Sequence, residues 1–191
     1  MGNPYVSDAG TYLVSVVFGL YTLAVMLRLL FQIVRADFYN PLSQAIVALT
    51  NPPLRQLRRF IPGLKGIDLP SVVLLLALKM TELWLTLFIR GAAPALPGLF
   101  VVAVAMLLKL AVYIVMFAII LEVVLSWISP GTYNPATQLL YSLTRPVLRP
   151  ARRLIPTLGG LDLSPMVAIV FLQIVIMLAL NPLEDLGARW L

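Results

Sequence analysis

The sequence predicts an all-α membrane protein with four transmembrane helices, arranged as two tandem repeats of the same orientation. The 191 residues are 61% hydrophobic and only 12% charged, whereas typical soluble proteins are about 25% charged. The apolar residues gather in four runs long enough to cross a bilayer. One stretch also occurs twice, at a constant offset of 94 residues.

The repeated stretch runs from Tyr39 to Asp68 and again from Tyr133 to Asp162, without a gap. A gapless match of this density indicates a duplicated unit. The identical pairs include Tyr39/Tyr133, Asn40/Asn134, Pro41/Pro135, Gln44/Gln138, Thr50/Thr144, Pro52/Pro146, Arg55/Arg149, Arg58/Arg152, Arg59/Arg153, Pro62/Pro156, Gly66/Gly160 and Asp68/Asp162.

The first repeat is predicted to occupy residues 1–95, with a transmembrane helix at about 10–34, a basic loop at 35–68 and a second transmembrane helix at about 69–89. Within the loop, Asn40-Pro41 and Asn51-Pro52 each suit the start of a short helix. Asparagine caps a helix well, and a proline in the first turn has no N–H to lose. Asp68 is predicted to cap the second transmembrane helix.

The second repeat, residues 96–191, is predicted to follow the same plan. It has a transmembrane helix at about 99–128, a basic loop at 129–162, a transmembrane helix at about 163–183 and a short tail. Asn134 and Asp162 are the equivalent capping residues. The last span is predicted to end at Asn181-Pro182, and the tail after it carries mixed charge.

Basic residues concentrate in the two loops and predict their side of the membrane. Two transmembrane helices separate the loops, so both loops lie on the same face. Nine of the 14 Lys and Arg residues are there: Arg35, Arg55, Arg58, Arg59, Lys65, Arg145, Arg149, Arg152 and Arg153. By the positive-inside rule the loops are cytoplasmic and both termini are outside.

The loop helices are predicted to be amphipathic, with leucine and isoleucine on one side and arginine on the other. A basic amphipathic helix beside a membrane span usually lies in the headgroup plane. We interpret the arginines as contacts for anionic lipid headgroups, or alternatively as a docking surface for a membrane or cytoplasmic protein. They are Arg55, Arg58, Arg59, Arg149, Arg152 and Arg153. Their position between apolar spans argues against nucleic acid as a partner.

Five charged residues fall inside the predicted spans: Arg28, Lys79, Glu82, Lys109 and Glu122. Arg28 and Glu122 occupy equivalent positions of the two repeats and the same depth, so they are predicted to meet and lock the repeats together. Lys79 and Glu82 suit an i, i+3 pair. The alternative is an ion or proton path lined by all five, and a third option is that Arg28 extends to the headgroups.

The doubled motif resembles the YggT family of small bacterial membrane proteins. It is carried by the segments 50–62 (TNPPLRQLRRFIP) and 144–156 (TRPVLRPARRLIP), and by Leu125-Ser126-Trp127 and the two Asp-Leu pairs that close the loops. The resemblance covers about residues 12–183 and implies a multi-pass inner-membrane protein. It also implies a link to osmotic or envelope stress, to cell division and morphology or, in plastid relatives, to cytochrome assembly or nucleoid distribution.

The chain has no cysteine and no histidine, so it offers no thiol nucleophile, no usual zinc site and no His ligand for haem. We expect no enzyme activity, no cofactor and no metal. The predicted function is a non-enzymatic inner-membrane protein that acts in envelope homeostasis or organisation through lipid and protein contacts. The alternative is a small channel or transporter subunit, which four helices per chain would form only as a homo-oligomer.

Overall fold

The computed structural model describes residues 4–63, 66, 68–128, 134–154 and 162–191. Within these residues every regular element is a helix, so the all-α prediction is confirmed. The elements are α1 (Pro4–Ile33), α2 (Pro41–Leu57), α3 (Leu69–Ile89), α4 (Leu96–Ile128), α5 (Pro135–Leu154), α6 (Ser164–Val175), the π-helix η1 (Ile176–Leu180) and α7 (Asn181–Ala188).

Four helical segments are long and apolar enough to cross a membrane, as predicted. They are Tyr5–Ile33, Leu69–Ile89, Leu96–Ile128 and Ser164–Ala188. Large apolar side chains point outward from them, such as Phe171 and Leu178, which are 61% and 76% exposed. Such a surface suits a lipid environment, where apolar exposure has no cost.

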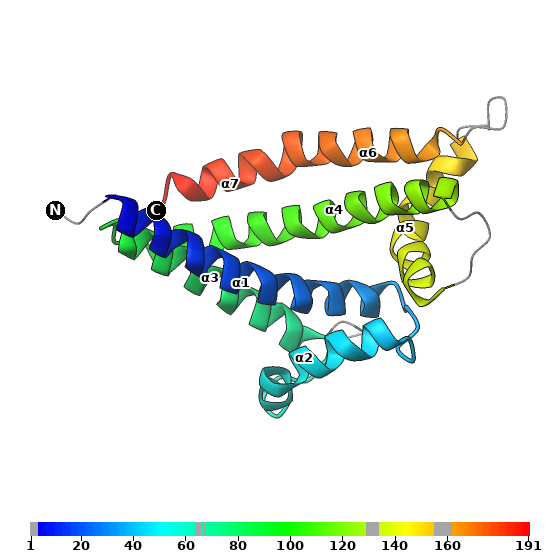
Figure 1. Cartoon of the computed structure of the whole chain (residues 1–191). Coiled ribbons are helices and arrows are strands. Elements are labelled where there is room, and N and C mark those ends of the chain that lie inside the picture. The colour runs from blue at the N-terminus through cyan, green and yellow to red at the C-terminus, as the bar shows by residue number, and fades with distance from the viewer. Residues whose placement is uncertain (1–3, 64–65, 67, 129–133, 155–161) are drawn as a thin grey trace.

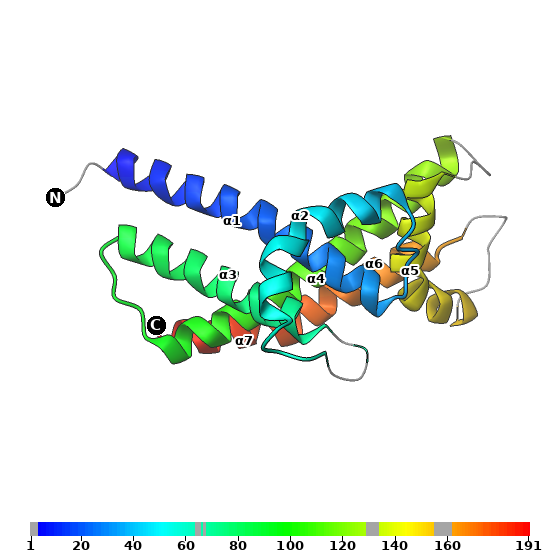
Figure 2. The same cartoon turned by 90° about the horizontal axis from the view of Figure 1, so that it is seen from below.

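The two repeats form two layers. In Figure 1, α1 lies beside α3, and α4 lies beside the succession α6, η1 and α7. Helices α3 and α4 join the layers, and α1 also touches α4. Both termini lie at one end of the bundle, whereas α2 and α5 lie toward the other (Figures 1 and 2). The two loop helices therefore share one side of the molecule.

Each loop contains one helix in the described residues, which corrects the prediction of two short helices in the first loop. Helix α2 continues through Pro52 and Pro53, and α5 continues through Pro146 and Pro150. An interior proline removes a backbone hydrogen bond and crowds the preceding turn, so it bends a helix without necessarily ending it. Figure 1 shows the last turns of α2 running in a different direction from its first turns.

The fourth span also continues beyond its predicted end. Helix α7 begins at Asn181 and carries the chain to Ala188, so most of the predicted tail is helical. Pro182 stands in the first turn of α7 and lacks the N–H that would bond the preceding turn. The backbone adjusts by widening into the π-helix η1 directly before it.

Two glycines allow α4 and α7 to pack closely. A Cβ atom on Gly187 would lie 2.8 Å from Cγ2 of Val102, and one on Gly98 would lie 2.6 Å from the carbonyl carbon of Trp190. Real Cβ contacts are longer than this. These glycines therefore set the distance between the start of α4 and the end of the chain.

Candidate functional site

The candidate site comprises the two loop helices and the buried charged residues that join them to the bundle. In the first repeat Arg28 of α1 is 6% exposed. One guanidinium nitrogen, Nη1, donates to Oγ1 of Thr50 at 2.8 Å and to Oδ1 of Asn51 at 2.9 Å. The Thr50 hydroxyl in turn donates to the backbone oxygen of Ile46 at 2.7 Å. Arg28 therefore fastens α2 to the transmembrane helix that precedes it.

Glu122 plays the equivalent part in the second repeat. It is 7% exposed, and its Oε2 accepts a hydrogen bond from the hydroxyl of Thr144 on α5. Its Oε1 accepts from Nη2 of Arg152 at 3.1 Å. Arg152 also donates from Nε to Oδ2 of Asp162 at 2.9 Å. The Arg152 guanidinium thus joins α4, α5 and the carboxylate of Asp162, two residues before α6.

The predicted pairing of Arg28 with Glu122 is wrong. Each has its partners on the loop helix of its own repeat, and no ion pair between the two is found in the described part of the chain. Equivalent positions share a depth in the membrane, but depth does not set the direction in which a helix presents a side chain. The sequence did contain the better signal, because Thr50 and Thr144 are identical residues of the repeated stretch.

The two aspartates that close the loops hold arginine side chains. Asp68 stands at the N-cap position of α3, yet its carboxylate makes no capping bond to the backbone, contrary to expectation. It accepts instead from Arg58 at 2.7 Å and from the Ser71 hydroxyl at 2.6 Å. Burial alone raises the pKa of the Asp68 carboxyl, but these hydrogen bonds outweigh it, so the pKa lies below its ordinary value.

Leu163, not Asp162, holds the N-cap position of α6, but Oδ1 of Asp162 accepts from the backbone N–H of Ser164, the first residue of that helix, at 2.9 Å. Burial raises the pKa of this carboxyl, whereas the bonds from Ser164 and Arg152 lower it, and the net pKa is below the ordinary value. For Arg152, burial lowers the pKa and the bonds to Asp162 and Glu122 raise it, so the guanidinium stays charged.

The asparagines at the starts of the loop helices accept capping bonds. Oδ1 of Asn40 accepts from the backbone N–H of Leu42 at 3.0 Å, and Oδ1 of Asn134 accepts from that of Thr137 at 2.9 Å. Asn40 makes a second bond, from its Nδ2 to the backbone oxygen of Pro135 at 2.6 Å. That bond connects the start of α2 with the start of α5, and so connects the two repeats.

The remaining intramembrane charges lie elsewhere. Nζ of Lys79 and Oε2 of Glu82 are 3.0 Å apart on α3, in the i, i+3 arrangement that the sequence suggested. Lys109 on α4 pairs with Glu184 on α7. The sequence did not indicate this partner, because Glu184 follows the predicted end of the last span and so was expected outside the bundle. Of the five charged residues, only Lys79 and Glu82 contact each other, and Arg28, Lys109 and Glu122 each have partners elsewhere.

The six loop arginines divide into two groups. Arg58 and Arg152 bind carboxylates, whereas the other four make no hydrogen bond or ion pair with any described residue. Those four are exposed, Arg55 on α2, Arg59 just after its end, and Arg149 and Arg153 on α5. Leu54 and Leu148 on the same helices are 0% and 1% exposed. Each loop helix thus buries leucine against the bundle and presents unpaired guanidinium groups outward.

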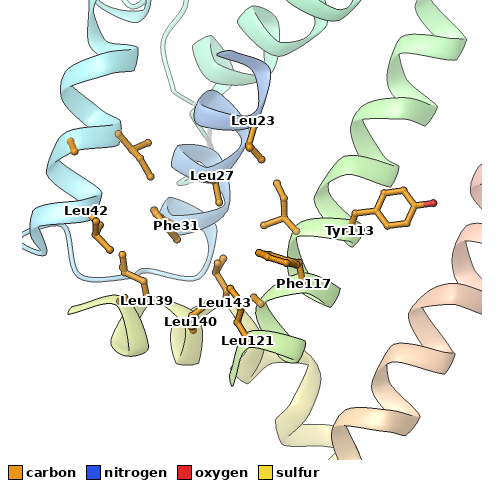
Figure 3. A pocket seen from close by; sticks show the side chains of 15 residues that line it. Leu23, Leu27, Phe31, Leu42, Tyr113, Phe117, Leu121, Leu139, Leu140 and Leu143 are labelled. Carbon is orange, nitrogen blue, oxygen red and sulfur yellow. The ribbon is translucent and has the colours of Figure 1, made fainter. Parts of the chain in front are cut away.

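Two cavities adjoin the loop helices. The first, of about 610 Å³, lies between the repeats and is lined by apolar side chains of α1, α2, α4 and α5. Figure 3 shows Leu27 and Phe31 of α1 facing it from one side, with Phe117 and Leu121 of α4 on another. The second, of about 490 Å³, lies beside α5 and is lined mainly by arginines, with Glu122 and Thr144 among its walls.

Comparison with known proteins agrees with this duplicated architecture. The family model described as CCB3/YggT matches the chain twice, over residues 7–89 and 101–183. Over 179 residues the chain is 43% identical to the Pseudomonas aeruginosa protein "Uncharacterized protein PA0392", covering 93% of this chain and 91% of the relative. It is 34% identical over 177 residues to "Uncharacterized protein YggT" of Escherichia coli strain K12, covering 93% and 92%. No solved structure matches the chain. With both repeats matched and relatives aligned along nearly their whole length, the chain belongs to the CCB3/YggT family.

Proposed function

We propose that the chain is a non-enzymatic inner-membrane protein whose two loop helices hold acidic lipids at the cytoplasmic surface. The observation that carries the proposal is the set of four exposed arginines on α5 and around the C-terminal end of α2. Arg55, Arg59, Arg149 and Arg153 are exposed and make no hydrogen bond or ion pair with another described residue. Each arginine near an anionic membrane surface contributes about 1 kcal/mol of attraction.

The buried polar groups support a scaffolding role for the rest of the molecule. Arg28 and Glu122 each hold a loop helix against a transmembrane helix, through Thr50 and through Thr144 and Arg152 respectively. Their hydrogen bonds fix the position of the loop helices relative to the transmembrane helices. The proposed role is in envelope homeostasis or organisation, where a fixed pair of basic helices gathers lipid and offers a surface to protein partners.

The channel alternative has less support. A charged path through one chain needs its charged side chains in succession, but Lys79 pairs with Glu82, and Lys109 pairs with Glu184. Arg28 and Glu122 point to different loop helices. Ion flux into liposomes that contain the purified protein would restore this alternative.

The proposal is tested by identifying the phospholipids that remain bound to the chain after purification. The variant with Arg55, Arg59, Arg149 and Arg153 all replaced by Gln should lose the enrichment of acidic over zwitterionic phospholipid, measured by mass spectrometry of extracted lipid. Arg90→Gln is the matched control, because Arg90 is an exposed arginine that follows α3 at the end of the bundle where the termini lie. Equal enrichment in the fourfold variant and the native chain would contradict the proposal.

A further inference from the structure

The groove of about 490 Å³ beside α5 differs from a general basic surface. It is lined by Glu122, Tyr141, Thr144, Arg145, Arg149, Arg152 and Arg153. Its inner wall is already bonded together, since Thr144 and Arg152 both donate to Glu122. Thr144 is 1% exposed and Glu122 is 7% exposed. The inner wall thus combines the buried, hydrogen-bonded side chains of Glu122 and Thr144 with that of Arg152, which is 49% exposed.

The outer wall of the groove is a stripe of residues spaced four apart on α5: Tyr141, Arg145, Arg149 and Arg153. Residues at this spacing lie on one face of a helix, where like charges destabilise it. None of these three arginines makes a hydrogen bond or ion pair with another described residue. Glu122 also lines the groove, but its carboxylate is paired with Arg152. Three guanidinium groups in one groove that have no carboxylate partner in the described part of the chain are suited to an anion with several acceptor oxygens, such as a phosphate.

The first repeat does not reproduce this arrangement. The residues equivalent to the stripe are Val47, Asn51, Arg55 and Arg59, so two arginines stand where the second repeat has three. Asn51 also accepts a hydrogen bond from Arg28, which stands at the position equivalent to Glu122. The two copies of the unit have therefore diverged at the positions that line the groove.

The groove lies near the end of α4 that leads into the second loop. Glu122 is six residues before the end of α4, a membrane-spanning helix, and six residues of helix span about 9 Å. Tyr141, at the other end of the stripe, is 52% exposed. Tyrosine is enriched where a membrane meets water, because its ring is apolar and its hydroxyl polar.

We infer that this groove of the second repeat is a specific site for the phosphodiester headgroup of an acidic phospholipid, bound by Arg145, Arg149 and Arg153. The inference rests on the proposed function, because it gives one of the two lipid-facing helices a defined binding site. It goes further in predicting that the repeats are unequal, with the tighter site on α5.

The duplication supplies a matched pair of variants for the test. R149Q/R153Q alters the groove, and R55Q/R59Q alters the equivalent arginines of the first repeat. Native mass spectrometry of the full-length chain in detergent, titrated with phosphatidylglycerol, measures the affinity of the tightest lipid. R149Q/R153Q should weaken it by roughly tenfold or more, whereas R55Q/R59Q should leave it unchanged.

Each other result has a distinct meaning. Equal weakening by both variants would overturn the specific site and leave the proposed function standing. No weakening by either would overturn both. If R149Q/R153Q fails to fold, R145Q removes one outer charge without touching the bonded inner wall and should weaken the lipid on its own; unchanged affinity would overturn the site. Displacement of phosphatidylglycerol by millimolar inorganic phosphate would overturn the lipid as the occupant.

Discussion

Thr50 and Thr144 occupy equivalent positions of the two repeats and hydrogen-bond buried side chains of opposite charge. A hydroxyl group has one donor hydrogen and two acceptor lone pairs. Thr50 accepts from Arg28 and donates to a backbone oxygen, whereas Thr144 donates to Glu122. The same residue at equivalent positions can therefore satisfy an arginine or a glutamate, which explains how the two repeats keep one architecture with opposite charges.

These contacts predict that Arg28 and Glu122 are energetically independent. In a double-mutant cycle with R28Q and E122Q, the coupling energy should stay within about 0.5 kcal/mol, because the two side chains have no shared partner. The free energy of unfolding in detergent, titrated with a denaturing surfactant, is the measurement. A cycle of E122Q with Thr144→Val is the positive control, and should show coupling of roughly 0.5–3 kcal/mol. Comparable coupling in both cycles would mean that the repeats are locked through Arg28 and Glu122 after all.

The site was only partly predictable from the sequence for a geometric reason. Repeat alignment gives the depth of a residue, and a charge in an apolar run indicates that a partner exists. Neither gives the direction of the side chain around its helix. Lys79 and Glu82 were placed together because they share one helix, while the partners of Arg28, Lys109 and Glu122 lie on other helices.

At the scale of the elements, the helix ends that adjoin the two loops were predicted best. Leu69–Ile89 agrees with the prediction, because Asp68 and Arg90 frame one apolar run. The first span begins at Pro4, six residues before its predicted start. Two other misjudged helix ends involve an interior or first-turn proline. Pro52 and Pro182 were taken as helix boundaries, yet a bend in α2 and the π-helix before α7 accommodate them. Tertiary contacts decide whether a proline ends a helix or bends it.

The close packing of α4 and α7 predicts a sharp response at one glycine. Gly187→Ala should destabilise the chain by about 1–3 kcal/mol, since its Cβ would lie 2.9 Å from the backbone nitrogen of Val102, an atom that cannot move aside. Thermal unfolding in detergent measures the effect. Gly19→Ala is the control, because nothing lies within 4 Å of a Cβ there. Equal melting temperatures for the two variants would show that α7 is not packed as described.

At the scale of the whole molecule, the repeat in the sequence is enough to predict most of the architecture. Two units of helix, loop helix and helix must have the same orientation, because an even number of spans separates their loops. The structure places α2 and α5 together and both termini at the opposite end. The apolar cavity between the repeats could not be predicted, since it depends on how far the two layers separate.

The side of the membrane on which the loop helices lie is open to a direct test. The chain contains no cysteine, so single substitutions provide unique labels. Gln56→Cys on α2 should react with a membrane-impermeant maleimide only after the cells are permeabilised, because the positive-inside rule places the loops in the cytoplasm. Arg90→Cys, at the other end of the bundle, should react in intact cells. The reverse pattern would invert the predicted topology.

The satisfaction of each buried charge within its own repeat has an evolutionary consequence. A unit that hydrogen-bonds its own buried charged group needs no second copy to satisfy it, so duplicating the gene segment leaves each of these groups with its hydrogen-bond partners. The position of Arg28 and Glu122 could then change sign in one copy without a compensating change in the other, because Thr50 and Thr144 suit both. Divergence of the two halves toward different ligands could begin from that freedom, while the fold stayed the same.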